Sequence, residues 1–483
     1  MWWHDAVIYQ VYPRSFQDSD GDGIGDLPGV MSRLDHIAGL GAAAVWLSPF
    51  YPSPDADFGY DVSDYTAVDS KYGSLEDFDH LVTAAHERNL KVLLDYVPAH
   101  TSVEHPWFRE RPDFYFWAES PPNNWRAAFG GTAWERDPAG GRYYLHSFFP
   151  EQADLNWRNP DVREAMTDVL EFWLARGVDG FRIDAADRLL KDPALRDDMP
   201  ATRPPLLPLH AEYARLQHVH SRNAPDIGIA LQGIRQAVSE AFLVGEAYVP
   251  TSELAPYLQA FDVAFAFEPM NAGPDARRLR KTIDAALTTG KIGWVLSNHD
   301  FERFASRFTG NVRAAAMLFA SLPGPLFLFQ GDEIGTADGP GVEPPLDRAG
   351  RDRFRHPMQW DPSPKGGFTT GTPWLPPIDP EMRSVQLQES DPDSILWLYR
   401  RLIASRGELG SELRFLDSPP GTVVLERGAY VVAVNFGDEE APLKLEGTLT
   451  LEARPGDGAD HDVLPAHGGW IVRGRRPYGR ASG

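Results

Sequence analysis

Cysteine is absent from the 483-residue chain, which excludes a disulfide framework and any metal site built on thiolates. Basic residues are also scarce: 46 Lys and Arg stand against 69 Asp and Glu, and the formal net charge is −23. Nucleic acids and anionic membranes bind basic surfaces, so this balance argues against both as partners. The sequence also has no run of 18 apolar residues of the kind that spans a membrane.

A signal peptide is another missing element. Residues 1–5, MWWHD, lack the basic start and apolar core of such a segment, and we therefore expect a cytoplasmic protein. What is present is ordinary for a globular chain, with 42% hydrophobic and 24% charged residues. The length exceeds one typical domain and leaves room for a large domain together with smaller ones.

Eight short apolar runs recur along the chain. They cover residues 6–16, 42–50, 91–100, 180–185, 241–247, 263–267, 293–300 and 325–333. Near-continuous apolar runs are typical of strands that are buried on both faces. Segments with helical periodicity separate most of the runs, which predicts parallel pairing. Eight such units predict an α/β fold, a closed (β/α)₈ TIM barrel.

Two connections are too long for simple loops, and the chain ends in a different pattern. Residues 101–159, rich in Trp, Pro, Phe and Gly, are expected to form a small inserted domain after the third strand, and residues 336–390 form a second insertion. After about residue 408 the pattern becomes short and alternating, which predicts an antiparallel β domain over 408–483. The barrel would then comprise residues 1–100 and 160–407.

Polar residues close most of the apolar runs and would meet at the C-terminal face of the barrel, where such barrels carry their active sites. They are Asp95, His100, Arg182, Asp184, Glu246, His299, Asp300 and Asp332. In GFRIDA (180–185), strand alternation sends Arg182 and Asp184 to the same face.

Three carboxylates, those of Asp184, Glu246 and Asp300, would share this mouth. Crowding like charges costs free energy, so the arrangement needs a chemical reason. Retaining glycoside cleavage provides one. One carboxylate attacks the anomeric carbon, while a second, kept protonated by its surroundings, donates its proton to the leaving oxygen.

Several motifs resemble those of a known family. GFRIDA, LVGEAY, LSNHD and DYVPAH are similar to the four conserved regions of glycoside hydrolase family 13, the α-amylase family. Within it, the chain resembles the α-glucosidase and oligo-1,6-glucosidase branch over nearly its whole length. Further matches are VIYQVYPRSF, DGDGIGDL, FGYDVSDY, QADLN (152–156) and HPMQWD.

The resemblance implies roles for the strand-end residues. Asp184 would be the nucleophile, Glu246 the general acid/base, and Asp300 the fixed acid that holds ring hydroxyls and stabilises the oxocarbenium-like state. Arg182 would orient Asp184 and lower its pKa, so that the nucleophile stays ionised.

The same resemblance implies residues that bind the sugar. They are Tyr60, Asp61, His100, Arg182, His299 and Arg355. Asp61 would bind hydroxyls at the non-reducing end and Tyr60 would be the stacking platform. Arg355 is the expected partner of Asp61, with Arg351 as the competing choice. The substrate implied is a small oligosaccharide or α-glucoside, and no cofactor is implied for catalysis.

The stretch DSDGDGIGD (18–26) is similar to half of an EF-hand loop, whose oxygen ligands suit a hard cation. The alternative is an acidic, Gly-rich turn without metal. Related glucosidases place Ca²⁺ or Mg²⁺ at the corresponding loop, far from the chemistry. The ligands implied for such a structural metal are Asp18, Asp20, Asp22, the Ile24 carbonyl and Asp26.

Two positions depart from the family pattern or vary within it. The third region usually reads VPNH, whereas this chain has Ala99, which cannot make the hydrogen bonds of the amide beside His100. Ala185 follows the predicted nucleophile, where relatives that prefer α-1,6 bonds tend to carry Val. The smaller side chain favours α-1,4 bonds.

The function expected is that of a retaining, exo-acting α-glucosidase that releases glucose from short oligosaccharides, with transglucosylation as a second outcome. Trehalose synthases, sucrose isomerases and sucrose hydrolases are the alternative, because they use the same three acids, and product analysis on maltose and sucrose would separate them. Transporter heavy subunits share the barrel but have lost the acids and carry a membrane helix. The three acids exclude that third class.

Overall fold

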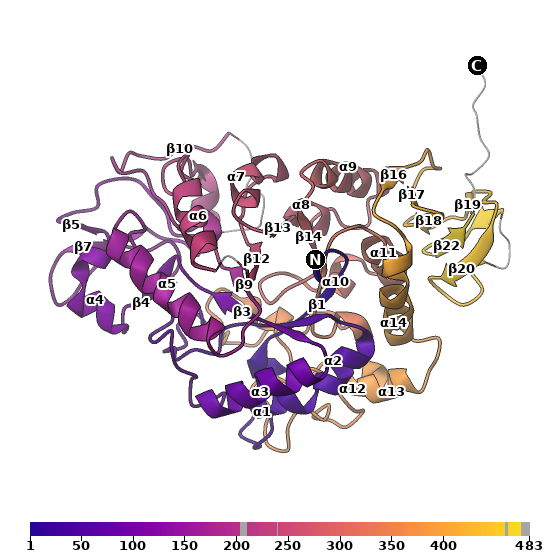
Figure 1. The fold of residues 1–483 in the computed structure, drawn as a ribbon, viewed down its shortest axis with the longest axis horizontal. Coiled ribbons are helices and arrows are strands. Elements are labelled where there is room, and N and C mark those ends of the chain that lie inside the picture. The colour runs from indigo at the N-terminus through magenta and orange to yellow at the C-terminus, as the bar shows by residue number, and fades with distance from the viewer. Residues whose placement is uncertain (203–209, 239, 459–461, 475–483) are drawn as a thin grey trace.

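The computed structural model describes residues 1–202, 210–238, 240–458 and 462–474 (Figure 1). Eight strands pair in parallel and close into a barrel in the order β1-β15-β14-β13-β12-β9-β3-β2. Their bounds are β1 (Val7–Val11), β2 (Ala44–Leu47), β3 (Lys91–Tyr96), β9 (Gly180–Ile183), β12 (Phe242–Gly245), β13 (Val263–Phe265), β14 (Ile292–Val295) and β15 (Leu326–Phe329). Each of the eight apolar runs forms one barrel strand, so the predicted fold class is confirmed.

The barrel strands are buried on both faces, as their continuous apolar character predicts. On β2, Trp46 belongs to the apolar cluster that fills the barrel, whereas Val45 and Leu47 belong to the larger cluster that packs under the helices. On β9, Phe181 and Ile183 belong to that outer cluster. Because side chains alternate along a strand, Arg182 between them faces the barrel interior.

Helices surround the barrel. Their bounds are α1 (Leu27–Ser32), α2 (Leu34–Leu40), α3 (Leu75–Glu87), α4 (Pro106–Glu110), α5 (Pro160–Leu174), α6 (Gly228–Ala237), α7 (Ala255–Leu258), α8 (Phe267–Met270), α9 (Ala276–Leu287), α10 (Phe304–Arg307), α11 (Val312–Ala320), α12 (Pro380–Arg383), α13 (Val385–Glu389) and α14 (Ile395–Ser405). Local signals set the starts of the long ones. Ser74 and Asp77 form a capping box at α3, and Asn159 followed by Pro160 starts α5.

Residues 101–159 carry small antiparallel sheets of their own. One pairs β4 (His100–Ser102) with β8 (Gln152–Asp154), and the other has the order β5 (Trp117–Ala118), β7 (Tyr143–Leu145), β6 (Trp134–Arg136). Trp125 and Trp134 belong to a separate apolar cluster in this segment. Strand β4 follows the end of the third barrel strand closely, so the inserted segment begins at the barrel mouth. A further pair, β10 (Met199–Pro200) and β11 (Leu216–Gln217), lies in the connection after β9.

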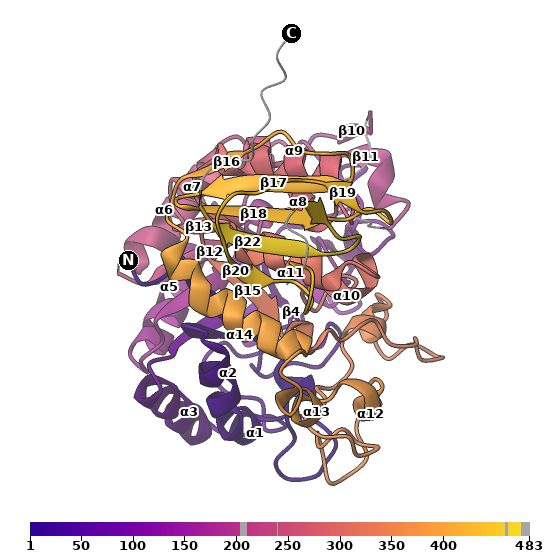
Figure 2. The same cartoon turned by 90° about the vertical axis from the view of Figure 1, so that its right-hand side faces the viewer.

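The C-terminal part forms an antiparallel sheet, which Figure 2 shows facing the viewer. Its order is β16 (Leu413–Phe415), β17 (Thr422–Arg427), β18 (Tyr430–Asn435), β22 (Gly469–Arg473) and β20 (Thr448–Glu452), and β19 (Ala441–Pro442) pairs with β21 (Val463–Leu464). The predicted antiparallel character is confirmed. Arg427 joins this sheet to the barrel, since it donates to the Ser321 carbonyl and to the Asp5 carboxylate.

Within the described ranges, no helix combines the length and the apolar character that crossing a bilayer requires.

Candidate active site

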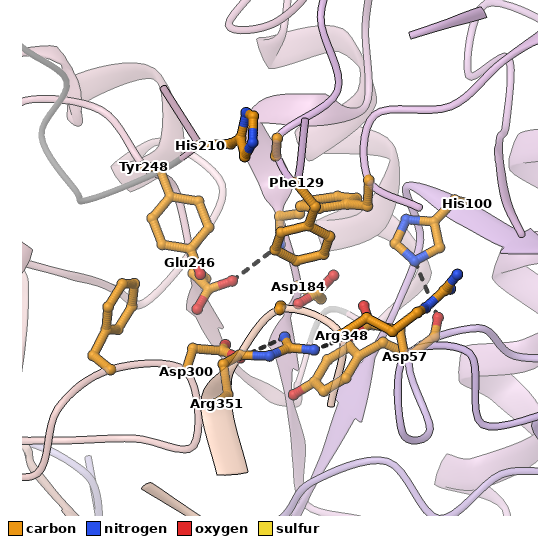
Figure 3. Close-up of a pocket in the computed structure, with 16 residues that line it drawn as sticks. Asp57, His100, Phe129, Asp184, His210, Glu246, Tyr248, Asp300, Arg348 and Arg351 are labelled. Carbon is orange, nitrogen blue, oxygen red and sulfur yellow. Dashed lines mark hydrogen bonds and ion pairs between the residues drawn. The ribbon is translucent and has the colours of Figure 1, made fainter. Parts of the chain in front are cut away.

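A pocket of about 280 Å³ lies at the mouth of the barrel (Figure 3). Asp184 follows β9 directly and Glu246 follows β12 directly, while Asp300 lies in the connection after β14. All three carboxylates line the pocket, so the structure brings together the three acids that the sequence singles out.

The Arg182 guanidinium connects two of these acids with a third buried carboxylate, that of Asp95. It is fully buried, and its Nη1 lies 2.5 Å from Asp95 Oδ1 and 2.6 Å from Asp184 Oδ1. Its Nη2 lies 2.6 Å from Glu246 Oε1. One cation therefore contacts three carboxylates, two of them in the pocket lining.

Burial decides the protonation of the two acids that Arg182 contacts in the pocket. It raises the pKa of Asp184 to about 7, with Arg182 acting against it and the charges of Asp95 and Asp300 adding to it. Burial likewise raises the pKa of Glu246 to about 7. Arg182 does lower the pKa of Asp184, as expected, but burial outweighs it, so the net pKa is raised. Near neutral pH each of these two carboxyl groups is therefore partly protonated.

Asp300 has the opposite character. Burial works to raise the pKa of Asp300, but the neighbouring His299, Arg351 and Arg355 hold it well below its usual range. Its Oδ1 lies 3.0 Å from Arg351 Nη1 and 3.2 Å from Arg355 Nη2. Asp300 is therefore ionised at every pH at which the pair Asp184 and Glu246 titrates.

Asp61 does not reach the pocket, contrary to the sequence expectation. Its buried carboxylate accepts hydrogen bonds from the Ser53 hydroxyl at 2.7 Å and from the backbone N–H groups of Ala56 and Asp57, so it shapes a turn. Asp57 lines the pocket in its place and accepts a hydrogen bond from Gln152 Nε2 at 2.9 Å. The two acids are only four residues apart in one loop, so the path of the backbone decides which of them faces the pocket.

Arg351, the competing choice for the partner of Asp61, contacts other acids instead. It contacts the carboxylates of Asp57, Asp300 and Asp347 and lines the pocket. Arg355 is fully buried behind it and donates to the backbone carbonyl of His299 at 2.8 Å. Arg351 is therefore the guanidinium that pairs with the pocket acid Asp57.

Tyr60 and His100 both line the pocket, as expected. His100 keeps its place without an asparagine at position 99, because its Nε2 can donate to the Tyr60 carbonyl oxygen at 3.0 Å. His299 is not in the pocket lining. It is fully buried behind Asp300 and stacks on the ring of Tyr60.

Several pocket residues were missed in the sequence. Tyr248 lies beside Glu246 (Figure 3), and the ring centroid of Phe301 lies 6.3 Å from that of Tyr248. Phe129 and Phe148 come from the inserted segment. Arg348 also lines the pocket and forms an ion pair with Glu151 at 2.8 Å, which joins the second insertion to the first. The abundance of aromatic residues in 101–159 was the available signal, but it does not say which rings face the cavity.

The acidic loop at residues 18–26 brings several carboxylates close together. It is separate in the sequence from the residues that line the pocket. Carboxylate oxygens of Asp18, Asp20 and Asp22 lie within 4.8 Å of one another, which fits a small hard cation. Asp26 is outside this cluster, because its carboxylate accepts hydrogen bonds from Ser19 and from Gly29 at the start of α1. The Ile24 N–H donates to Asp22 Oδ1 at 2.7 Å.

Comparisons with known proteins agree with the geometry. A family model described as the α-amylase catalytic domain matches residues 10–413. The chain is 39% identical to a protein of Rhizobium meliloti (strain 1021) named "Probable alpha-glucosidase", over 98% of this chain and 97% of that one. It is 36% identical to an oligo-1,6-glucosidase of Parageobacillus thermoglucosidasius, over 96% and 95% of the two chains.

Solved structures give the same picture. An α-glucosyl transfer enzyme, XgtA, superposes with a TM-score of 0.91 at 36% identity, and the match covers 98% of this chain and 99% of that one. The trehalulose synthase MutB from Pseudomonas mesoacidophila MX-45 superposes with a TM-score of 0.89 at 31% identity, with the same coverage.

The raised pKa values of Asp184 and Glu246 can be measured directly. We expect the carboxyl carbons of Asp184 and Glu246 to titrate around pH 7 in ¹³C NMR spectra, with assignments from Asp184→Asn and Glu246→Gln. The charge of Asp300 raises both pKa values, so Asp300→Asn should lower them. Titration of both groups near pH 4, where exposed carboxyls titrate, would contradict this description.

Proposed function

The chain belongs to the α-amylase family and is a glycoside hydrolase, and from this membership we propose that it is a retaining, exo-acting α-glucosidase. The observation that carries the proposal is the contact of one buried guanidinium, that of Arg182, with both Asp184 and Glu246. It supports a pair of neighbouring carboxyl groups that share one proton, which is the state that double displacement requires.

The proposed reaction uses the two groups in turn. Asp184 attacks the anomeric carbon of the terminal sugar, while Glu246 donates its proton to the oxygen of the leaving group. A water molecule then gives its proton to Glu246 and attacks the anomeric carbon, which breaks the bond to Asp184 and restores both groups. Asp300, held ionised by its two arginines, stabilises the positive charge that develops on the ring in both steps.

The proposed exo action rests on the side of the pocket opposite Glu246. There Asp57 and Arg351, both labelled in Figure 3, form an ion pair. Arg348 bridges to Glu151 of the inserted segment. Asp57 and Arg351 offer hydrogen-bonding groups to the hydroxyls of one terminal sugar. The cavity, about 280 Å³, is at the small end of the range for ligand sites, which supports short substrates.

Glucosyl transfer is the second candidate. It is favoured by one observation, the superposition on an α-glucosyl transfer enzyme and on a trehalulose synthase over nearly the whole chain. Incubation with maltose, and separately with sucrose, distinguishes the candidates by product analysis. Free glucose as the main product supports hydrolysis, whereas new disaccharides or larger glucosides support transfer.

The three carboxylates can be tested one by one. Asp184→Asn, Glu246→Gln and Asp300→Asn should each leave the protein folded and lower kcat on maltose, since loss of general acid catalysis alone is worth about 10²–10⁴-fold. Asp332→Asn is the matched control, because this buried acid follows β15 and bonds Ser297 outside the pocket lining. Near-native kcat in any of the three variants would remove that residue from the mechanism.

Ala185 allows a test of linkage preference. It lines the pocket directly after the nucleophile, and we expect a higher kcat/KM on maltose than on isomaltose. Ala185→Val should shift the ratio toward isomaltose, because one or two methyl groups in a pocket are worth about 1–3 kcal/mol. Equal or reversed preference in the unchanged enzyme would contradict the proposal.

The control for this test follows from the backbone. Ala185 has a φ of 42°, in the left-handed region that β-branched residues avoid, so Ala185→Val should also lower the melting temperature. Ala185→Gly accepts the same backbone and only enlarges the pocket. It should keep the preference for maltose.

For the acidic loop we propose a structural cation, Ca²⁺ or Mg²⁺, held by Asp18, Asp20 and Asp22. A cation bound only by the native state stabilises it by RT ln(1 + [L]/Kd), about 2.7 kcal/mol at a hundredfold excess over Kd. Excess chelator should therefore lower the melting temperature without changing kcat at low temperature. In Asp20→Asn the melting temperature should no longer respond to chelator. The site would be contradicted if chelator left the melting temperature of the unchanged protein unaltered and metal analysis found that protein free of bound cation.

A further inference from the structure

The ring of His299 is held in a fixed plane behind the pocket. It is fully buried and lies between the rings of Tyr12 and Tyr60, at centroid distances of 5.7 and 5.2 Å and interplanar angles of 9° and 5°. Burial lowers the pKa of His299 to about 3, so the ring is neutral and carries one proton. The two stacked tyrosines fix the plane of the ring but leave open which nitrogen carries that proton.

Gln10 lies at the Nδ1 edge of the ring. This residue of β1 is almost fully buried, and its Nε2 lies 2.9 Å from His299 Nδ1 and 3.1 Å from the Ser48 hydroxyl. Its Oε1 has no hydrogen-bond partner among the described residues. An amide N–H that points at Nδ1 requires a lone pair there, and the proton must then be on Nε2.

Asp300 lies at the opposite edge. Its Oδ1 is shared by Arg351 and Arg355, whereas His299 Nε2 lies 3.3 Å from its Oδ2, close enough for electrostatic attraction but without hydrogen-bond geometry. An N–H at Nε2 would be attracted by the ionised carboxylate, and a lone pair there would be repelled. Oδ2 is also the oxygen that the arginines leave available to a substrate hydroxyl.

The opposite orientation of the Gln10 side-chain amide is the alternative arrangement. With Oε1 toward the ring, Gln10 would accept from Nδ1–H and from the Ser48 hydroxyl, which would satisfy its carbonyl. The Nε2 lone pair would then face the Asp300 carboxylate. An interaction with a charged group outweighs one with a neutral carbonyl, so the orientation in the structure is preferred although Oε1 stays unpaired.

We propose that Gln10 is a positioning residue that holds His299 as the neutral Nε2–H tautomer and thereby orients the Asp300 carboxylate for the sugar. Its effect on turnover rests on the function proposed above, but its effect on the tautomer does not. The tautomer is a property of the protein without substrate and can be measured there.

The test is ¹⁵N NMR of protein labelled in the histidine rings. The signals of His299 are those that disappear in His299→Gln. In the unchanged protein we expect a protonated Nε2 and an unprotonated Nδ1. In Gln10→Glu, measured at a pH high enough to ionise the introduced carboxyl group, that group can only accept, so the proton should move to Nδ1.

Ser48→Ala is the matched control. It removes the other partner of the same Gln10 amide but does not touch His299, so the Nε2–H tautomer should persist. Gln10→Leu, which removes the donor, should lower kcat on maltose by on the order of 10²-fold, as a misoriented group does, with a smaller change in KM.

Three results would overturn the proposal. One is a His299 ring protonated at Nδ1 in the unchanged protein, which requires no variant to fold. Another is a proton that stays on Nε2 in folded Gln10→Glu. The third is unchanged kcat in folded Gln10→Leu of a protein that does cleave maltose. If the tautomer is as expected and maltose is not cleaved, only the proposed substrate is wrong.

Discussion

The Arg182 guanidinium, with no exposed surface, lies within 2.6 Å of oxygen atoms on Asp95, Asp184 and Glu246. Taking these charges out of water is expensive, and a buried ion cluster of this kind is not retained for stability alone. Its consequence is that carboxylates from three different strand ends can meet. Without the cation, burial and mutual repulsion would leave Asp184 and Glu246 protonated and inert, and the barrel mouth would have no nucleophile.

The environment separates acids that are chemically alike. Asp184 and Glu246 share one guanidinium and have pKa values raised to about 7, whereas Asp300 is surrounded by Arg351 and Arg355 and stays ionised. Groups whose surroundings push their pKa values apart can take different roles at one pH. The number of cations around each carboxyl group, rather than the type of acid, therefore decides whether the group titrates near neutral pH or stays ionised.

The sequence predicts the barrel and the strand-end acids because both depend on patterns that repeat. Asp184 and Glu246 follow apolar runs directly, so parallel closure brings them to the pocket lining. Asp57 was missed in favour of Asp61, and Arg351 was only the second choice. These residues lie in connections without periodicity, where one turn of backbone decides which side chain faces the cavity and which one shapes the loop. Motif resemblance finds such a loop but does not orient its side chains.

The contacts that join the two insertions over the pocket differ in strength from the contacts that hold its acids. Arg348 and Glu151, which join the two insertions, are 48% and 39% exposed, and an ion pair this exposed contributes about 0–1 kcal/mol. Arg348 also lies over the ring of Phe149, at 4.2 Å from its centroid, which adds a contact of similar size. The contact of Arg348 with Glu151 is therefore weak, whereas Arg182 fixes Asp184 and Glu246 through buried contacts. Arg351 of the same insertion as Arg348 contacts Asp300, so the second insertion also takes part in fixing one of the acids.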